Sequence, residues 1–196
     1  MKKMIIFVIL LISNDLFAME KYLLVCCDVL LKVSLDSAMH QVGKIEKTNK
    51  NDGDVQIYQK AVGLKKGEPY CAAGVYWCFA SAANDLGLSV NEISVVRTGL
   101  ANKMYNEAKK KGTRVVYKAK KNDLIVWRKR NSYNGHIERI FEVGRAGWVK
   151  TVGFNVAGIV NNKQVEGVFI KKRNIYQRIQ NLFIRGLIGF KGQESK

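Results

Sequence analysis

The stretch 67–83 constrains the fold more than any other part of the sequence. It holds the only proline of the chain, Pro69, close behind Gly67, and it continues into a segment rich in alanine and aromatic residues. Proline suits the start of a helix because its missing N–H is not needed there, so we predict a helix that begins close to Cys71. The small and apolar residues that continue to Ala83 predict that this helix is buried in the centre of a domain.

Cys71 stands at the start of this predicted helix, where free backbone N–H groups and the positive end of the helix dipole favour a thiolate. A disulfide with Cys78 is excluded, because seven residues of helix separate two Cα atoms by about 10 Å. The four cysteines do not have the spacing of paired metal ligands, and the chain has only two histidines, His40 and His136. We therefore expect no metal and no cofactor, and we regard Cys71 as a candidate nucleophile.

Composition limits the class of protein without choosing a function. With 196 residues, of which 47% are hydrophobic, the chain has room for one domain with a proper core and a short appendage. The net charge of +17 predicts an affinity for polyanions, which include nucleic acid, anionic lipid and the acidic polymers of a cell wall.

The N-terminus has the pattern of an export signal. Residues 1–18 combine a short basic start, an apolar run too short to span a bilayer comfortably, and Ala18 at a plausible cleavage position. A second apolar segment, residues 19–34, follows it. Cys26 offers a position for lipid attachment, but Val25 is larger than the residue that a lipoprotein cleavage box requires. We expect an exported protein, periplasmic or extracellular, and we do not favour the lipid anchor.

The remaining chain changes from a helical to a strand pattern near residue 113. Apolar spacing predicts helices over 35–48, 55–62 and 91–111 besides the Cys71 helix, and later runs rich in β-branched and aromatic residues predict strands. The predicted strands are 115–117, 124–127, 135–143, 148–154 and 165–171. Helices followed by an antiparallel sheet indicate an α+β domain over 35–191, in which 174–191 is either a strand or a helix.

A cysteine nucleophile needs a base, and histidine suits that role. His136 follows a turn and opens a predicted strand that could reach Cys71, whereas His40 lies in a predicted helix and is not favoured. A third group must orient the imidazole. Asn155, at the end of the next strand, and Glu138, on the same strand face as His136, are the two candidates.

The segment 69–78 resembles the nucleophile helix of CHAP domains, the cysteine, histidine-dependent amidohydrolases/peptidases, which are papain-like and related to NlpC-type enzymes. Gly135-His136-Ile137 is similar to the Gly-His-hydrophobic motif of that family, and Gly153-Phe154-Asn155 to its later segment. The resemblance covers roughly residues 35–170. Two features depart from the family pattern. Gly153 stands where some relatives carry glutamate, and Glu138-Arg139 replaces small apolar residues.

This resemblance implies a papain-like fold, with the nucleophile helix packed on the sheet, and a peptidoglycan hydrolase. Its catalytic residues would be Cys71, His136 and Asn155, and its substrate would be a wall peptide or the N-acetylmuramoyl-L-alanine amide. The implied substrate-binding residues are Tyr70, Trp77, Asn51 and Asp52. We expect a monomer that binds peptidoglycan, with other anionic envelope polymers as possible ligands.

One alternative function belongs to a different class. A papain-like domain without activity could bind wall polymer or nucleic acid through its basic segments, which are interleaved with aromatic residues. The basic segments are 109–111, 118–121, 128–130 and 171–173. We consider them ordinary solvated faces and do not expect nucleic acid as a partner.

Overall fold

The computed structural model describes residues 19–193, which form a mixed α+β fold of four α-helices and one seven-stranded sheet. The predicted signal, residues 1–18, lies outside the described residues. The elements, in chain order, are β1 (Glu20–Cys27), α1 (Asp28–His40), α2 (Gln56–Val62), α3 (Cys71–Asp85), α4 (Ala101–Lys111), β2 (Thr113–Val115), β3 (Leu124–Lys129), β4 (Gly135–Val143), β5 (Trp148–Val160), β6 (Lys163–Asn174) and β7 (Leu182–Gln193). Short 3-10 turns lie at Gly53–Val55 and Val90–Glu92.

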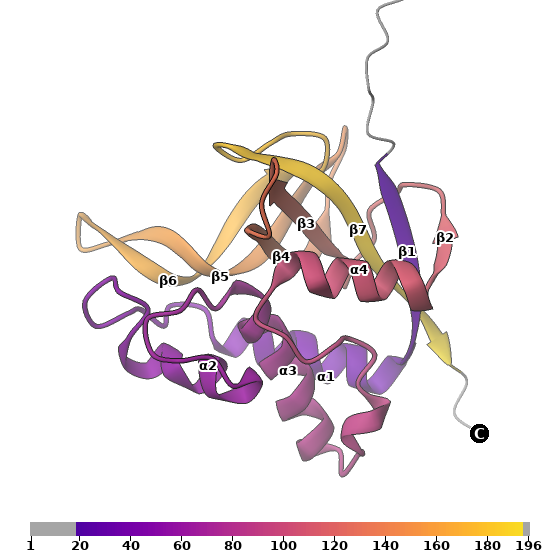
Figure 1. The fold of residues 1–196 in the computed structure, drawn as a ribbon, viewed down its shortest axis with the longest axis horizontal. Coiled ribbons are helices and arrows are strands. Elements are labelled where there is room, and N and C mark those ends of the chain that lie inside the picture. The colour runs from indigo at the N-terminus through magenta and orange to yellow at the C-terminus, as the bar shows by residue number, and fades with distance from the viewer. Residues whose placement is uncertain (1–18, 194–196) are drawn as a thin grey trace, which may run out of the picture.

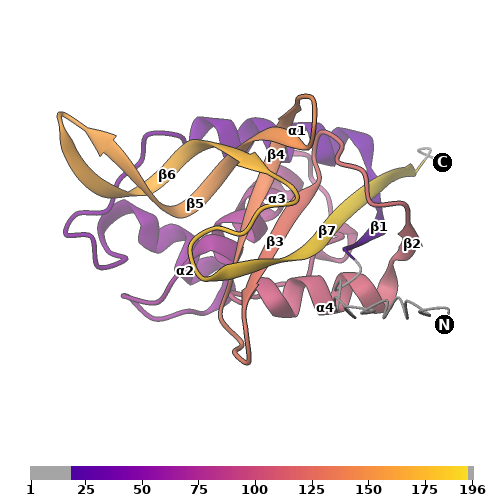
Figure 2. The ribbon, with the colours of Figure 1, turned by 90° about the horizontal axis from the view of Figure 1, so that it is seen from above.

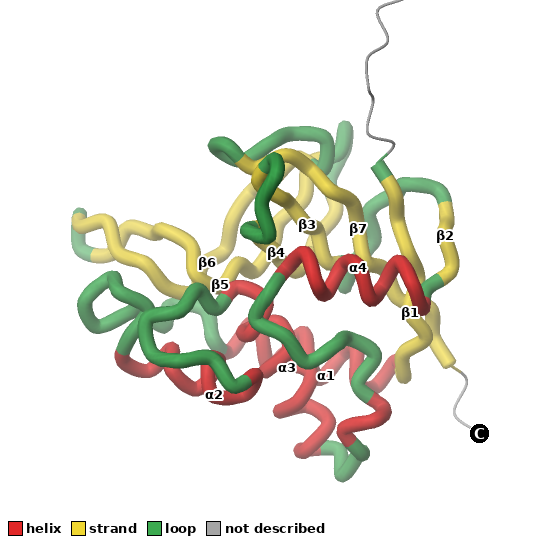
Figure 3. The backbone as a smooth tube through the Cα atoms, in the orientation of Figure 1, coloured by secondary structure: helices red, strands yellow, loops and turns green. Residues whose placement is uncertain are grey.

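The sheet has the strand order β2-β1-β7-β3-β4-β5-β6. All neighbouring strands are antiparallel except β1 and β7, which run parallel, so the sheet is mixed and not purely antiparallel as predicted. Helices α1, α2 and α3 gather on one side of the sheet, and α4 lies beside β1, β3 and β7 (Figures 1 and 3). The long β5–β6 hairpin extends beyond the rest of the sheet (Figure 2).

Helix α3 is the predicted central helix, and it begins at Cys71 with Tyr70 as its N-cap. Pro69 therefore precedes the cap and does not lie in the first turn. Ten of the fifteen residues of α3 are buried, so the helix has almost no solvent face. Strand β5 approaches it closely at Gly74, where a Cβ atom would lie 2.3 Å from the ring of Phe154. This approach brings the residue after Phe154 close to the start of the helix.

The N-terminal apolar segment is part of the domain, which moves the predicted boundary at residue 35 back to Glu20. Strand β1 pairs with β7 over its whole length and with β2 on its other side. Lys21, 1% exposed, fixes the strand through an ion pair of 2.5 Å with Asp123. No local pattern predicts the pairing of β1 with β7, because the paired residues, such as Glu20 and Gly186, lie far apart in the chain.

The predicted strands 124–127 and 135–143 are confirmed within two residues, whereas 148–154 and 165–171 lie inside the longer β5 and β6, and 115–117 overlaps β2 only at Val115. The segment 174–191 contains a turn followed by β7. Two helices differ more. The first begins at Asp28 and ends at His40, and the predicted helix 91–111 is helical only from Ala101, after a 3-10 turn.

Candidate active site

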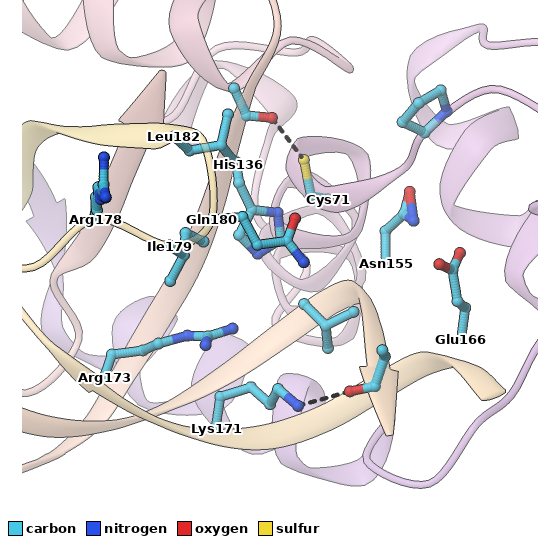
Figure 4. A pocket seen from close by; sticks show the side chains of 14 residues that line it. Cys71, His136, Asn155, Glu166, Lys171, Arg173, Arg178, Ile179, Gln180 and Leu182 are labelled. Carbon is cyan, nitrogen blue, oxygen red and sulfur yellow. Dashed lines mark hydrogen bonds between the residues drawn. The ribbon is translucent and has the colours of Figure 1, made fainter. Parts of the chain in front are cut away.

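A cavity of about 650 Å³ lies between the start of α3, the first residues of β4, the base of the β5–β6 hairpin and the loop that leads into β7. Cys71, His136 and Asn155, the three predicted catalytic residues, all line it. Figure 4 shows Cys71 between His136 on one side and Asn155 on the other. The structure thus brings together residues from three separate elements.

Cys71 is 5% exposed and its side chain reaches the cavity from the first turn of α3. Its Sγ lies 3.9 Å from the carbonyl oxygen of Gly135, the residue before His136. No side chain caps the helix start, so the first backbone N–H groups of α3 are not taken by a cap. A negative charge on or near Sγ would therefore be stabilised by these groups.

His136 is held in place by the turn that precedes it. The side-chain amide of Asn102, on α4, donates hydrogen bonds to the carbonyl oxygens of Tyr133 and Asn134, at 2.9 and 3.1 Å. The His136 ring lies 5.9 Å from the ring of Trp127, its cross-strand partner on β3. The imidazole is 8% exposed and therefore has little freedom to turn away from Cys71.

Glu138 is hydrogen-bonded to the imidazole of His136. Its Oε1 lies 3.0 Å from Nε2 of His136, and since a carboxylate only accepts, Nε2 carries the proton. This leaves Nδ1 as the ring nitrogen available to Cys71. Glu138 is fully buried, accepts two-pronged hydrogen bonds of 2.6 to 3.1 Å from Arg173, and accepts a further one of 2.5 Å from Thr151.

A glycine on the neighbouring strand makes room for the carboxyl group of Glu138. Glu138 on β4 faces Gly153 on β5 in the sheet register. A Cβ atom at Gly153 would lie 3.1 Å from Cδ and Oε1 of Glu138, so glycine leaves the space that this carboxyl group fills. The carboxylate beside His136 therefore comes from β4, and β5 contributes no side chain opposite it.

His136 and Glu138 each favour the charged form of the other. Burial opposes a charged imidazole, but hydrogen bonds and charge interactions with Cys71 and Glu138 raise the pKa of His136 to about 9. Burial also opposes ionisation of Glu138, but hydrogen bonds from His136 and Arg173 lower its pKa to about 2. At neutral pH the site therefore contains an imidazolium beside a carboxylate.

Asn155 has a different position from the one that would orient His136. It sits at a bulge in β5, with φ 57°, where the register with β6 shifts between Phe154 and Val156. Its Oδ1 accepts a hydrogen bond of 3.1 Å from the backbone N–H of Tyr70, beside Cys71. Glu138 takes the place beside the imidazole, and Asn155 lies at the start of α3.

The four predicted substrate-binding residues do not line the cavity. Tyr70 is fully buried and its hydroxyl contacts Glu46, while Trp77 packs edge-on against Tyr58. Asn51 donates a hydrogen bond to the carbonyl of Gly67, in the loop before α3, and Asp52 accepts hydrogen bonds from Thr48 in its own loop. Each of these side chains is engaged elsewhere, in packing or in hydrogen bonds.

Sequence reasoning missed the cationic lining of the cavity, which Lys171, Arg173 and Arg178 provide. Lys171 and Arg173 were assigned to a solvated face. Their alternation on β6 gave a weak signal, but only the pairing of β6 with β5 and of β5 with β4 brings Arg173 to Glu138.

The other predicted absences concern cysteines, metals and membranes. Cys26, Cys27, Cys71 and Cys78 are all free. Within residues 19–193 there is no group of three or more histidine, cysteine or acidic side chains that could hold a metal ion. In the same range, no helix has both the length and the apolar character needed to cross a membrane.

Comparison with known proteins gives one match. The family model of the CHAP domain matches residues 62–155, a range that runs from the end of α2 to Asn155 and includes Cys71, His136 and Glu138. No curated protein and no solved structure matches the chain. CHAP domains form a family of peptidoglycan amidases and peptidases, typically dependent on a cysteine and a histidine. Residues 62–155 of this chain, just under half of its length, are therefore similar to a CHAP domain.

Proposed function

We propose that this protein is an exported peptidoglycan hydrolase that cleaves an amide bond of the wall through Cys71 and His136. The observation that supports this most directly is the cavity that contains both residues, with the His136–Glu138 hydrogen bond of 3.0 Å beside them. The buried, charged pair keeps His136 protonated, which suits a thiolate–imidazolium pair with Cys71.

The reaction would be acyl transfer in two steps. The Cys71 thiolate attacks the amide carbonyl carbon and forms a tetrahedral oxyanion, and His136 donates its proton to the departing amine as the C–N bond breaks. Water then attacks the thioester, with His136 accepting its proton, and the acid and free Cys71 are released. Glu138 holds the imidazole in the orientation and tautomer that both steps need.

The oxyanion would be bound at the start of α3. The backbone N–H of Cys71 is one donor, and the Nδ2 amide of Asn155, whose Oδ1 is held by Tyr70, is the second. Tyr70 itself is not available, because its N–H is bonded to Asn155 and its hydroxyl to Glu46. Asn155 thus remains a catalytic residue in this proposal, with a role at the oxyanion.

Export with a cut after Ala18 agrees with the position of β1. This strand begins at Glu20, so such a cut leaves it intact, whereas a cut before Cys26 would remove most of it. The cut removes Lys2, Lys3 and Asp15, a net loss of one positive charge from the +17 of the whole chain, so the exported protein keeps a net charge of +16, which attracts anionic polymers of the wall. The N-terminal sequence of protein recovered outside the cytoplasm should begin at Met19; a start at Cys26 would contradict the cut.

The test is digestion of purified peptidoglycan with the parent protein and with Cys71→Ala, scored by released amines and by fragment masses. Release by the parent alone is expected, and the masses would identify the bond. If neither protein releases amines while both bind the wall, the enzyme proposal is wrong and the alternative, an inactive wall-binding module, is supported.

A further inference from the structure

The cavity carries charged side chains that the proposed reaction does not use. Arg178, in the loop between β6 and β7, is exposed and has no hydrogen bond or ion pair with any other residue of 19–193. Lys171 donates a 2.6 Å hydrogen bond to the carbonyl of Ala157 but has no carboxylate partner in that range. Arg173 differs from both, because it already forms an ion pair with Glu138.

These charges are distributed unevenly around Cys71. Figure 4 shows Arg178 beyond His136 and Glu166 beyond Asn155, on opposite sides of the thiol. The Glu166 side chain, partly exposed on β6, has no ion-pair partner in the described part of the chain. A substrate in the cavity therefore meets a positive charge at one end and a negative charge at the other.

The direction of the substrate follows from the chemistry. His136 must give its proton to the departing amine, so the amine part of the substrate lies on the His136 side of Cys71. The acyl part, whose oxyanion contacts the start of α3, lies on the Asn155 side. Arg178 consequently faces the part of the substrate that leaves, and Glu166 faces the part that becomes the thioester.

We propose that the cavity selects a peptide with a free carboxylate on the amine side of the scissile bond, and that Arg178 binds this carboxylate. A guanidinium binds a carboxylate through two parallel hydrogen bonds. Glu166 repels an anionic group on the acyl side, so the two charges together fix which way the peptide lies. This inference rests on the proposed function.

The test uses muropeptides, released from the wall by a glycosidase, in two matched forms. One form is untreated, and in the other the free carboxylates are converted to carboxamides. Cleavage is measured as kcat/KM for the parent, for Arg178→Gln and for Arg145→Gln, which removes an exposed arginine in the β4–β5 turn, away from the cavity. Thermal unfolding of each variant checks that it is folded.

We expect the parent to prefer the untreated form by about tenfold, as one charge-assisted hydrogen-bonded contact supplies. This ratio should approach one in Arg178→Gln and remain at the parent's value in Arg145→Gln. The mass of the released amine fragment should contain the carboxylate. Equal cleavage of both forms, or a preference that survives Arg178→Gln, would overturn the inference and leave the proposed function intact.

Failure of the proposed function gives a different result. If the parent cleaves neither form, the hydrolase proposal is wrong, and direct binding to Cys71→Ser decides the inference. Tighter binding of untreated muropeptides that depends on Arg178 would support a carboxylate site, whereas equal binding or none would refute it.

Discussion

Replacement of Glu138 by glutamine tests the central interaction of the site. The change keeps the size of the side chain but removes the charge that Arg173 and His136 face, at a position with no solvent exposure. The difference between the ordinary pKa of 4.5 and the value of about 2 corresponds to about 3 kcal/mol in favour of the carboxylate. Removal of one partner of a buried ion pair lowers the free energy of unfolding by an amount of this order.

We therefore expect Glu138→Gln to lower the free energy of unfolding by about 3 kcal/mol, measured by urea unfolding at neutral pH. Glu142→Gln is the matched control, since it lies on the same strand and pairs with Lys150 at 2.9 Å with both side chains about half exposed. That pair should contribute less than about 1 kcal/mol.

The pH dependence of this difference has a defined sign. A carboxyl group with a lowered pKa stabilises the fold fully above about 4.5 and loses this effect as the pH falls through about 2. The gap between parent and Glu138→Gln should hold from neutral pH to about 5 and narrow below it. A glutamine variant as stable as the control at neutral pH would refute the reasoning.

Three further predictions concern catalysis. Glu138→Gln should reduce kcat/KM on the order of a thousandfold, because the imidazole loses its orienting partner, and a loss under tenfold would contradict that role. The parent's kcat/KM should decline as the pH rises through about 9, where His136 loses the proton that the amine needs; a decline near 6.5 would contradict the raised pKa. Asn155→Ala should lower kcat about a hundredfold if its amide binds the oxyanion. Its control is Asn161→Ala, at the hairpin tip with a similar positive φ of 50°, and equal kcat values in the two variants would exclude the oxyanion role.

The local sequence was enough to propose Cys71 as the nucleophile and His136 as its base. The turn with Pro69 and the apolar run after it predict a buried helix whose first residue is Cys71, and the structure has this helix. The Asn134-Gly135 turn likewise predicts a strand that begins beside His136. Both inferences depend on backbone preferences that act over a few residues, which is why they can be drawn without a tertiary structure.

The third member of the site could not be chosen from the sequence. Period-two alternation places Glu138 on the same strand face as His136. Asn155 is an equally good candidate from the sequence, because it ends the next predicted strand. The decision depends on the register between β4 and β5, which sets Gly153 opposite Glu138, and on the bulge that turns Asn155 toward Tyr70. Register arises from the packing of the whole sheet and is not encoded in any short segment.

The sequence by itself thus determined that the four helices precede strands β2 to β7, and it located the helix that presents Cys71 and the strand that presents His136. Only the tertiary structure decided that β1 pairs with β7 inside the sheet, that Arg173 neutralises Glu138, and that Arg178 and Glu166 border the same cavity. Local elements follow from the preferences of neighbouring residues. Contacts such as that of Arg173 with Glu138, 35 residues apart, exist only when several strands are paired at once.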